Sequence, residues 1–318
     1  MILSAIRIKE RILGVSPEET TFARRGFTPG DAAIQKRLER IGLTFVNGYN
    51  VALGEDRPDR LATRLDAVEP DFRGVAFEGA AMALTLLDYV TPWKKDRLTA
   101  FLKGPGAAHV YMAHVGAGWA LARLRRNANR FLARRDPLLG WLAVDGYGFH
   151  EGYFHWRRFF REKAPPGRLT GYARRAFDQG LGRSLWFVDC ADVSRIPATI
   201  AAFPEARQAD LWSGIGLACA YAGGADRHAL ESLRAAAGRL RSHAAQGAAF
   251  AAKARERAGN PAPHTELACK VWCGLSAEAA ANLTDASLDR LSATAEAPSY
   301  EVWRRRIQSQ FAEEVVTA

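Results

Sequence analysis

The sequence predicts an all-α protein built as a helical-hairpin repeat array. Three observations support this class: a glycine-centred segment recurs about every 34 residues, alanine-rich stretches with helical spacing of apolar residues surround it, and no strong strand-like alternation is present. The chain has 318 residues with 28 glycines and only 14 prolines. It is therefore long enough for several hairpins and has few prolines to interrupt the helices.

Seven segments align without gaps on a central glycine. Successive glycines are 31, 37, 36, 28, 34 and 33 residues apart, and apolar residues recur three positions before them and usually five positions after them. These offsets share one helical face. Because a glycine inside a helix costs about 1 kcal/mol relative to alanine, we expect each one to permit close contact between two helices. The seven are Gly48, Gly79, Gly116, Gly152, Gly180, Gly214 and Gly247.

The period is that of the tetratricopeptide hairpin, but the strict residue pattern of that hairpin is missing. Each hairpin would leave an apolar face open that its neighbours cover, in either a tetratricopeptide-like superhelix or an α/α ring. Residues 1–20 are predicted to form an N-terminal docking helix, and residues 21–318 a single all-helical repeat domain. Residues 300–311 are expected to form a terminal amphipathic helix.

The chain carries a formal net charge of +10, with arginines concentrated in residues 123–135 and 157–163. Such stretches are solvated helix faces or contact an acidic partner or an anionic membrane. No nucleic-acid-binding module accompanies them, so we expect no nucleic acid. Four cysteines without a CxxC pair, and no signal peptide, predict a reduced cytoplasmic protein. No run of 18 apolar residues is present, so we expect no helix that spans a membrane.

The residue before each repeat glycine is polar in six of the seven segments. These side chains fall at one equivalent place in each unit, so they could line a shared pocket. Alternatively, they bond to the neighbouring hairpin or are solvated. The six are Asn47, Glu78, Glu151, Gln179, Ser213 and Gln246.

Residues 145–156 contain the densest group of ionisable and aromatic side chains. His150 beside Glu151 could perform acid–base chemistry, although aromatic packing with one capping histidine is the alternative. His155 is five residues from His150 and diverges from it around a helix, so we expect no metal, and no cofactor either. The candidate catalytic residues are His150, Glu151 and Asp178; the candidate ligand-binding residues are Asn47, Glu78, His114, Tyr147, Tyr153, Gln179 and Gln246.

An ordered string of segments, including FEGAAMALTLLDY, DGYGFHEGYFH, FDQGLGRSLWFV and LWSGIGLACAYAGG, resembles the domain-of-unknown-function 1702 family. The resemblance runs from about residue 15 to residue 307. Members of that family are typically encoded beside enediyne polyketide synthases. The resemblance therefore implies a role in making or handling a polyene or enediyne product, and it supplies no catalytic residues.

We therefore expect an accessory protein of enediyne-type polyketide biosynthesis. It would bind a polyene intermediate, the polyketide synthase or a membrane-protein partner. One alternative is a cofactor-independent enzyme that isomerises or cyclises the polyene. A second alternative is a general helical-repeat adaptor for protein interactions.

Overall fold

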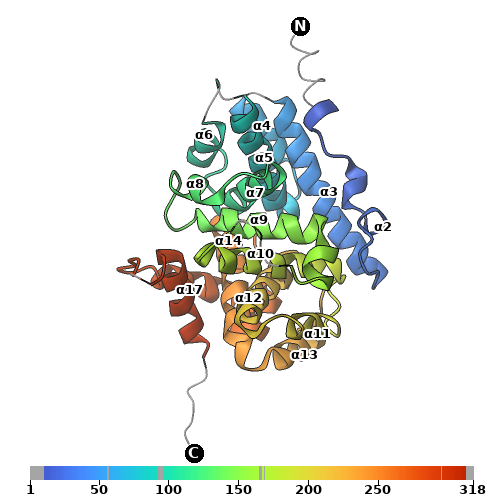
Figure 1. The fold of residues 1–318 in the computed structure, drawn as a ribbon, viewed down its shortest axis with the longest axis vertical. Helices are drawn as coiled ribbons and strands as arrows, with labels where there is room; N and C mark the ends of the chain where they lie inside the picture. The colour runs from blue at the N-terminus through green and yellow to red at the C-terminus, as the bar shows by residue number, and fades with distance from the viewer. Residues whose placement is uncertain are drawn as a thin grey trace, which may run out of the picture.

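The computed structural model describes residues 11–55, 57–91, 93, 96–164, 167, 169–294 and 296–312, and these residues form helices and loops with no strand (Figure 1). The predicted all-α class is confirmed for this part of the chain. Residues 1–10 of the expected docking helix lie outside the described residues. Immediately after them, the Leu13 carbonyl accepts a 2.7 Å hydrogen bond from the Tyr49 hydroxyl, which ties this segment to the following long helix.

Seven long helices form the body of the protein, and each packs against the next one in chain order. They are α3 (Ala32–Gly54), α5 (Pro70–Val90), α7 (Val110–Arg123), α9 (Trp141–Phe154), α10 (Tyr172–Val188), α12 (Glu205–Ala222) and α14 (Arg241–Arg257). Figure 1 shows α3, α5 and α7 in the upper part of the molecule, α9, α10 and α14 near the middle, and α12 below them.

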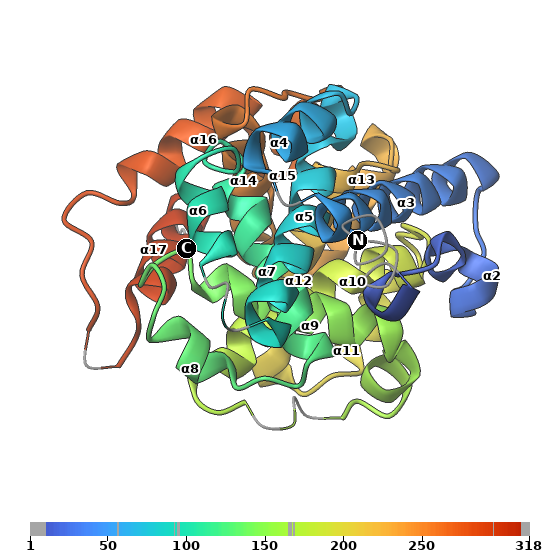
Figure 2. The same ribbon diagram turned by 90° about the horizontal axis from the view of Figure 1, so that it is seen from above.

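Shorter helices connect the long ones or cover their ends, as the view from above also shows (Figure 2). They are η1 (Pro17–Thr20), α2 (Phe22–Arg25), α4 (Pro58–Asp66), α6 (Arg97–Lys103), α8 (Ala128–Leu132), η2 (Arg157–Arg161), α11 (Ile196–Ala201), α13 (Arg227–Ala237), η3 (Gly238–Leu240), α15 (Pro263–Cys273), α16 (Ala277–Ala286) and α17 (Ser299–Gln310).

Local sequence sets several helix ends. The Asp31 side chain accepts hydrogen bonds from the backbone N–H groups of Ala33 and Ile34 and so begins α3. Proline occupies the first position of α5 and of α15, where a missing N–H costs nothing. At the end of α12, Gly223 takes a φ of 68°, which stops the helix.

The glycines are the points at which neighbouring long helices touch. A Cβ atom on Gly79, Gly116, Gly180, Gly214 or Gly247 would overlap a backbone carbonyl of the preceding long helix. Gly48, Gly118, Gly148, Gly182 and Gly216 would overlap a carbonyl of the following one in the same way. The expectation that glycine permits close helix–helix contact is therefore confirmed, because a larger side chain has no room between the backbones.

Two of the seven predicted equivalences are shifted. A repeat glycine faces the carbonyl of the residue that precedes the equivalent position in the preceding long helix; this holds for Gly116, Gly180, Gly214 and Gly247. By the same rule, the equivalent position in α9 is Gly146, and in α3 it is Val46. Gly152 instead faces the Ser184 side chain. The true series is 46, 79, 116, 146, 180, 214 and 247, with spacings of 33, 37, 30, 34, 34 and 33.

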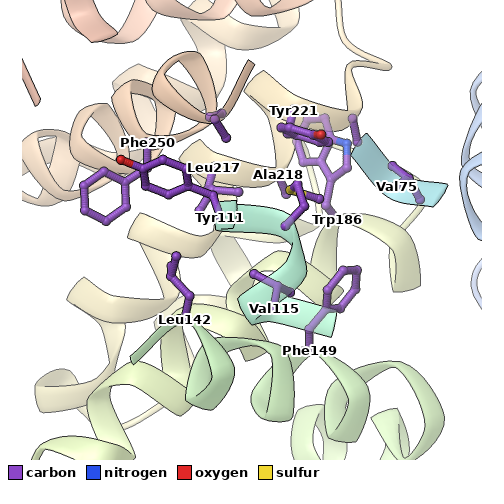
Figure 3. Packing of buried hydrophobic residues seen from close by; sticks show 14 of the residues in the cluster. Val75, Tyr111, Val115, Leu142, Phe149, Trp186, Leu217, Ala218, Tyr221 and Phe250 are labelled. Atoms are coloured by element: carbon purple, nitrogen blue, oxygen red, sulfur yellow. The ribbon is translucent and has the colours of Figure 1, made fainter. Parts of the chain in front are cut away.

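The first and last parts of the series also meet. Arg255 of α14 donates to Asp71 at the start of α5 (3.1 Å), and Arg37 of α3 donates to the Ala222 carbonyl at the end of α12 (2.6 Å). Figure 3 shows the apolar interior that results, where Val75 of α5 and Tyr221 of α12 lie near the same Trp186 side chain. The curved row of helices thus encloses one continuous core.

Candidate functional site

A large open cleft lies between the loop after α7, the second half of α9 and η2. Its volume is about 1140 Å³. Side chains and backbone from several segments line it, among them Met82, Tyr147, His150, Phe154 and Phe177. The cleft is large enough for a sizeable organic ligand.

Arginines dominate the charged groups of this cleft. Arg123, Arg125, Arg126, Arg157 and Arg158 line it. Arg157 and Arg158 stack on the neighbouring Trp156 and Phe159 rings, and Arg126 stacks on Tyr89. None of these arginines pairs with a carboxylate in the part of the chain that the structure describes. The cleft therefore presents guanidinium groups that remain available to an anionic ligand.

The His150–Glu151 pair forms part of the cleft wall. His150 Nδ1 lies 3.1 Å from Glu151 Oε1, and the imidazole packs against Trp119 and Phe154. Burial lowers the pKa of His150, which the hydrogen bond to Glu151 opposes. At neutral pH the imidazole is thus uncharged, the form that can accept a proton. Tyr147 lines the same cleft.

A smaller apolar pocket of about 60 Å³ adjoins the cleft. Val15, Glu19, Met82 and Phe154 line both cavities, so these residues form the boundary between them. Aromatic side chains make up much of the pocket wall: Phe45, Trp119, Phe149, Tyr153, Phe154 and Phe187. The two cavities together offer a cationic region next to an apolar one.

Glu78 of α5 lies in the wall of this apolar pocket. Its side chain is 3% exposed, and its Oε1 atom makes no hydrogen bond. Burial raises the pKa of the Glu78 carboxyl from its ordinary value of 4.5 to about 7, while Arg183 lowers it to a smaller extent. Asp145 adds to the rise, and the nearby Trp119 indole opposes it. Below pH 7 the group is therefore a neutral acid that can donate a hydrogen bond.

Four buried side chains form a polar ladder across α9, α10, α12 and α14: Asp145, Gln179, Ser213 and Gln246. Gln179 Nε2 donates to Asp145 Oδ2 at 2.8 Å, and Ser213 Oγ lies 2.9 Å from Gln246 Oε1 and 3.3 Å from Gln179 Oε1. Arg183 pairs with Asp145. The members of the ladder bond to one another, although Gln246 Nε2 makes no hydrogen bond, and the ladder lines neither cavity.

Helix α17 seals the ladder with one face. Tyr300, Arg304 and Gln308 are four residues apart, and all three bond to Gln179 or Gln246. Arg304 also pairs with the buried Asp210 (2.8 Å) and with Glu301 (3.5 Å). The expected terminal helix is confirmed, and it is a core element.

The candidate site residues of the sequence analysis separate into different environments. His150, Glu151 and Tyr147 meet in the cleft, and Glu78 and Tyr153 line the adjoining pocket. Gln179 and Gln246 belong to the polar ladder.

The remaining three candidates line neither cavity. Asn47 is exposed on α3, and His114 bonds through Nδ1 to the Val110 carbonyl of its own helix (2.8 Å). Asp178 pairs with Arg207 through two oxygens, at 2.9 and 2.5 Å. The gap-free alignment places Asn47 and Glu151 among the polar residues that precede the repeat glycines. In the structure, the equivalent positions in α3 and α9 are occupied by Phe45 and Asp145.

The aromatic wall of the pocket and the place of Asp145 in the ladder are two features that the sequence did not predict. Trp119 and Phe149 face the pocket from α7 and α9, and each lies near a glycine that marks a helix crossing. That position indicated burial, but only the packing of the helices shows that a cavity remains beside these rings.

Within the described ranges, no group of histidine, cysteine and carboxylate side chains is arranged to hold a metal ion. The four cysteines are free, as expected for a chain without a disulfide framework. A search of the described helices finds none that is both long and apolar enough to cross a membrane.

The fold and the cavities define an all-helical protein with an arginine-lined cleft beside an apolar pocket. The family model described as "Protein of unknown function (DUF1702)" matches residues 4–311, so the chain belongs to this family. No curated protein and no solved structure matches the chain.

Proposed function

We propose that this protein is a cytoplasmic accessory factor of enediyne-type polyketide biosynthesis that binds a polyene intermediate. The observation that carries the proposal is the arginine-lined cleft of about 1140 Å³ with an apolar, aromatic pocket next to it. An apolar chain with an anionic end, such as a carboxylate or the phosphate of a carrier arm, matches this pair of environments.

Binding of a conjugated tetraene fatty acid, cis-parinaric acid, tests the proposal because its fluorescence changes when water is excluded. The double variant Arg126→Glu with Arg158→Glu should weaken binding at least tenfold, since two attractive charges become repulsive. The matched control is Arg227→Glu with Arg290→Glu, which makes the same change of charge at exposed positions outside the cleft. Equal weakening in both double variants would show that the cleft is not the binding site.

The His150–Glu151 contact in the cleft wall supports a second candidate function, an enzyme that isomerises or cyclises the polyene without a cofactor. The neutral imidazole would accept a proton from the chain, and Glu151 would stabilise the imidazolium formed. Turnover of the purified polyene by the wild type, compared with His150→Ala combined with Glu151→Gln, tests this role. Unchanged conversion by the double variant would remove both residues from the mechanism.

The accessory role has a second form, in which the cleft arginines dock an acidic region of the synthase or of a membrane-protein partner. A general helical-repeat adaptor would use the same surface for other acidic partners. Co-precipitation with each partner at low and high salt tests it. Partner capture that survives the Arg126→Glu and Arg158→Glu double variant would exclude the cleft as the docking surface.

We also propose that the long helices are the inner helices of a repeated hairpin, wound into a closed α/α ring and not an open tetratricopeptide-like superhelix. The regular register of the glycines supports the repeat. The bonds from Arg255 to Asp71 and from Arg37 to the Ala222 carbonyl support closure.

A further inference from the structure

Glu78 differs from the other buried polar residues at the helix crossings because its neighbours in the series are apolar. The residues that present their carbonyls to the next glycine are, in order, Phe45, Glu78, Val115, Asp145, Gln179 and Ser213. Asp145, Gln179 and Ser213 are consecutive and bond to one another. Glu78 lies between Phe45 and Val115, neither of which offers a side-chain partner.

Glu78 has an unbonded oxygen beside the apolar pocket. The carboxyl is 3% exposed, its Oε1 is unpartnered, and it lines the apolar pocket together with Phe45 and Trp119. The Trp119 Nε1–H is buried and lies close enough to lower the pKa of the Glu78 carboxyl, but it is not in hydrogen-bonding geometry with Glu78 Oε1. An unbonded buried polar group is unfavourable, so the unbonded Glu78 oxygen favours a hydrogen-bonding group that enters the pocket.

We infer that the pocket takes the far end of the ligand, and that this end carries an oxygen that accepts a hydrogen bond from Glu78. The inference rests on the proposed function and specifies its ligand: an apolar chain with an anion at the end held by the cleft arginines and a carbonyl or hydroxyl oxygen at the other. A chain that ends in a plain methyl group fits the apolar wall but leaves Glu78 unbonded.

The other charged and titratable groups around Glu78 are consistent with a neutral donor. Arg183 reaches it from α10, but Asp145 of α9 already pairs with that guanidinium. Tyr221 of α12 is also near enough to sense its charge. Because burial raises the pKa of Glu78 to about 7, the donor form is abundant at pH 6 and scarce at pH 8.5.

Two acids of equal chain length test the inference: hexadecanoic acid and 15-oxohexadecanoic acid, which has a ketone next to its terminal methyl group. Affinities are measured by calorimetry below the micellar concentration, at pH 6 and pH 8.5. For the wild type at pH 6, the keto acid should bind about fivefold to tenfold more tightly, the increment of one hydrogen bond. This preference should shrink at pH 8.5.

Two substitutions identify the donor. Glu78→Leu should abolish the preference for the keto acid, whereas Glu78→Gln, which keeps an N–H donor without a charge, should retain it at both pH values. Thr85→Val is the matched control, because it removes another unpartnered buried polar group from the same helix outside the pocket; it should behave as the wild type.

The outcomes separate the two proposals. Binding of both acids with the same preference in the wild type and in Glu78→Leu, or a wild-type preference that does not change with pH, would overturn the inference while leaving the cleft as a binding site. Failure of the wild type to bind either acid would overturn both. If Glu78→Leu does not fold, the contrast between Glu78→Gln and the wild type at pH 8.5 decides the question.

Discussion

Glu78 and Gln179 occupy the same position in the series of helix crossings, yet their surroundings are opposite. Both are buried, with exposures of 3% and 0%, and both present a carbonyl to a glycine of the next long helix. Gln179 bonds to Asp145 and Tyr300 and lies within bonding distance of Ser213. Glu78 faces a cavity with an oxygen unbonded. The comparison teaches that the same position in the series is bonded to neighbouring side chains in one half of the molecule and leaves an unbonded acid beside a cavity in the other.

The largest effect should come from breaking the ion cluster that seals the ladder. Arg304→Ala leaves the buried carboxylates of Asp210 and Glu301 short of a partner, and should lower the free energy of unfolding by about 3–5 kcal/mol in urea denaturation. Arg305→Ala is the control, because this arginine also pairs with Glu301 but its side chain is 61% exposed. Its loss should cost no more than about 1 kcal/mol. Similar losses for the two variants would contradict a specially stabilising ladder.

The pH dependence of the free energy of unfolding should distinguish Glu78 from the side chains of the ladder. The pKa of Glu78 is about 7 in the folded protein against an ordinary value of 4.5, so the folded state holds its proton more tightly than the unfolded state. Stability is therefore lost as pH rises from 4.5 to 7, and the loss is complete above 7. Glu78→Gln should remove this loss, gaining about 3 kcal/mol relative to the wild type between pH 4 and pH 8.

Urea denaturation across this pH range measures the Glu78→Gln effect. Thr85→Val on the same helix has no ionisable group to lose, so its difference from the wild type should stay constant with pH. A difference between Glu78→Gln and the wild type that is equally flat would mean that Glu78 ionises normally in the folded protein.

The glycine contacts themselves allow a test of intermediate size. In Gly214→Ala, the new methyl group meets the Gln179 carbonyl and the Arg183 backbone nitrogen, so α10 and α12 must separate at the ladder. A loss of about 1–3 kcal/mol is expected from this overpacking. In Gly42→Ala of α3, the three atoms nearest to the new methyl group belong to the side chains of Thr20 and Tyr153, at 3.0 Å or more, so this variant should cost less. A larger loss of stability for Gly42→Ala than for Gly214→Ala would contradict the view that contact between backbones requires glycine at these positions.

The smallest effect on stability is expected in the cleft. Arg158 is exposed and stacks on Phe159 without an ion pair among the described residues, so Arg158→Ala should change the free energy of unfolding by no more than about 1 kcal/mol. The same variant should bind cis-parinaric acid more weakly, with a shallower dependence on salt. A large loss of stability with unchanged binding would assign this arginine a structural role.

Sequence patterns predicted the elements better than their register. The glycines, the apolar positions around them and the terminal helix at Tyr300 all correspond to structural features. The alignment failed where α3 has Val46 in place of a glycine and where α9 contains Gly146, Gly148 and Gly152 within seven residues. A gap-free alignment cannot decide which of these glycines is the equivalent one. Aligning on Gly48 and Gly152 therefore placed Asn47 and Glu151 at positions that Phe45 and Asp145 occupy in the structure.

The candidate site was predictable in its parts but not as a whole. The crowding of His150, Glu151 and Tyr147 in one segment indicated a site, and all three line the cleft. Asp178 is also a predicted catalytic residue, but it lines neither cavity: burial raises its pKa, and Arg207, 29 residues further along the chain, pairs with it. The residues next to Asp178 in the sequence do not reveal a partner that lies so far along the chain.

The sequence by itself determined that the chain is helical, because helical periodicity acts through neighbours along the chain. It also indicated that the long helices touch at glycines, because a missing Cβ leaves room for a second backbone whichever helix supplies it. Only the tertiary structure decided which buried polar groups are satisfied. Whether Gln179 has a partner and Glu78 has none depends on the side chains that the adjacent helices bring beside them, and these come from residues tens of positions away.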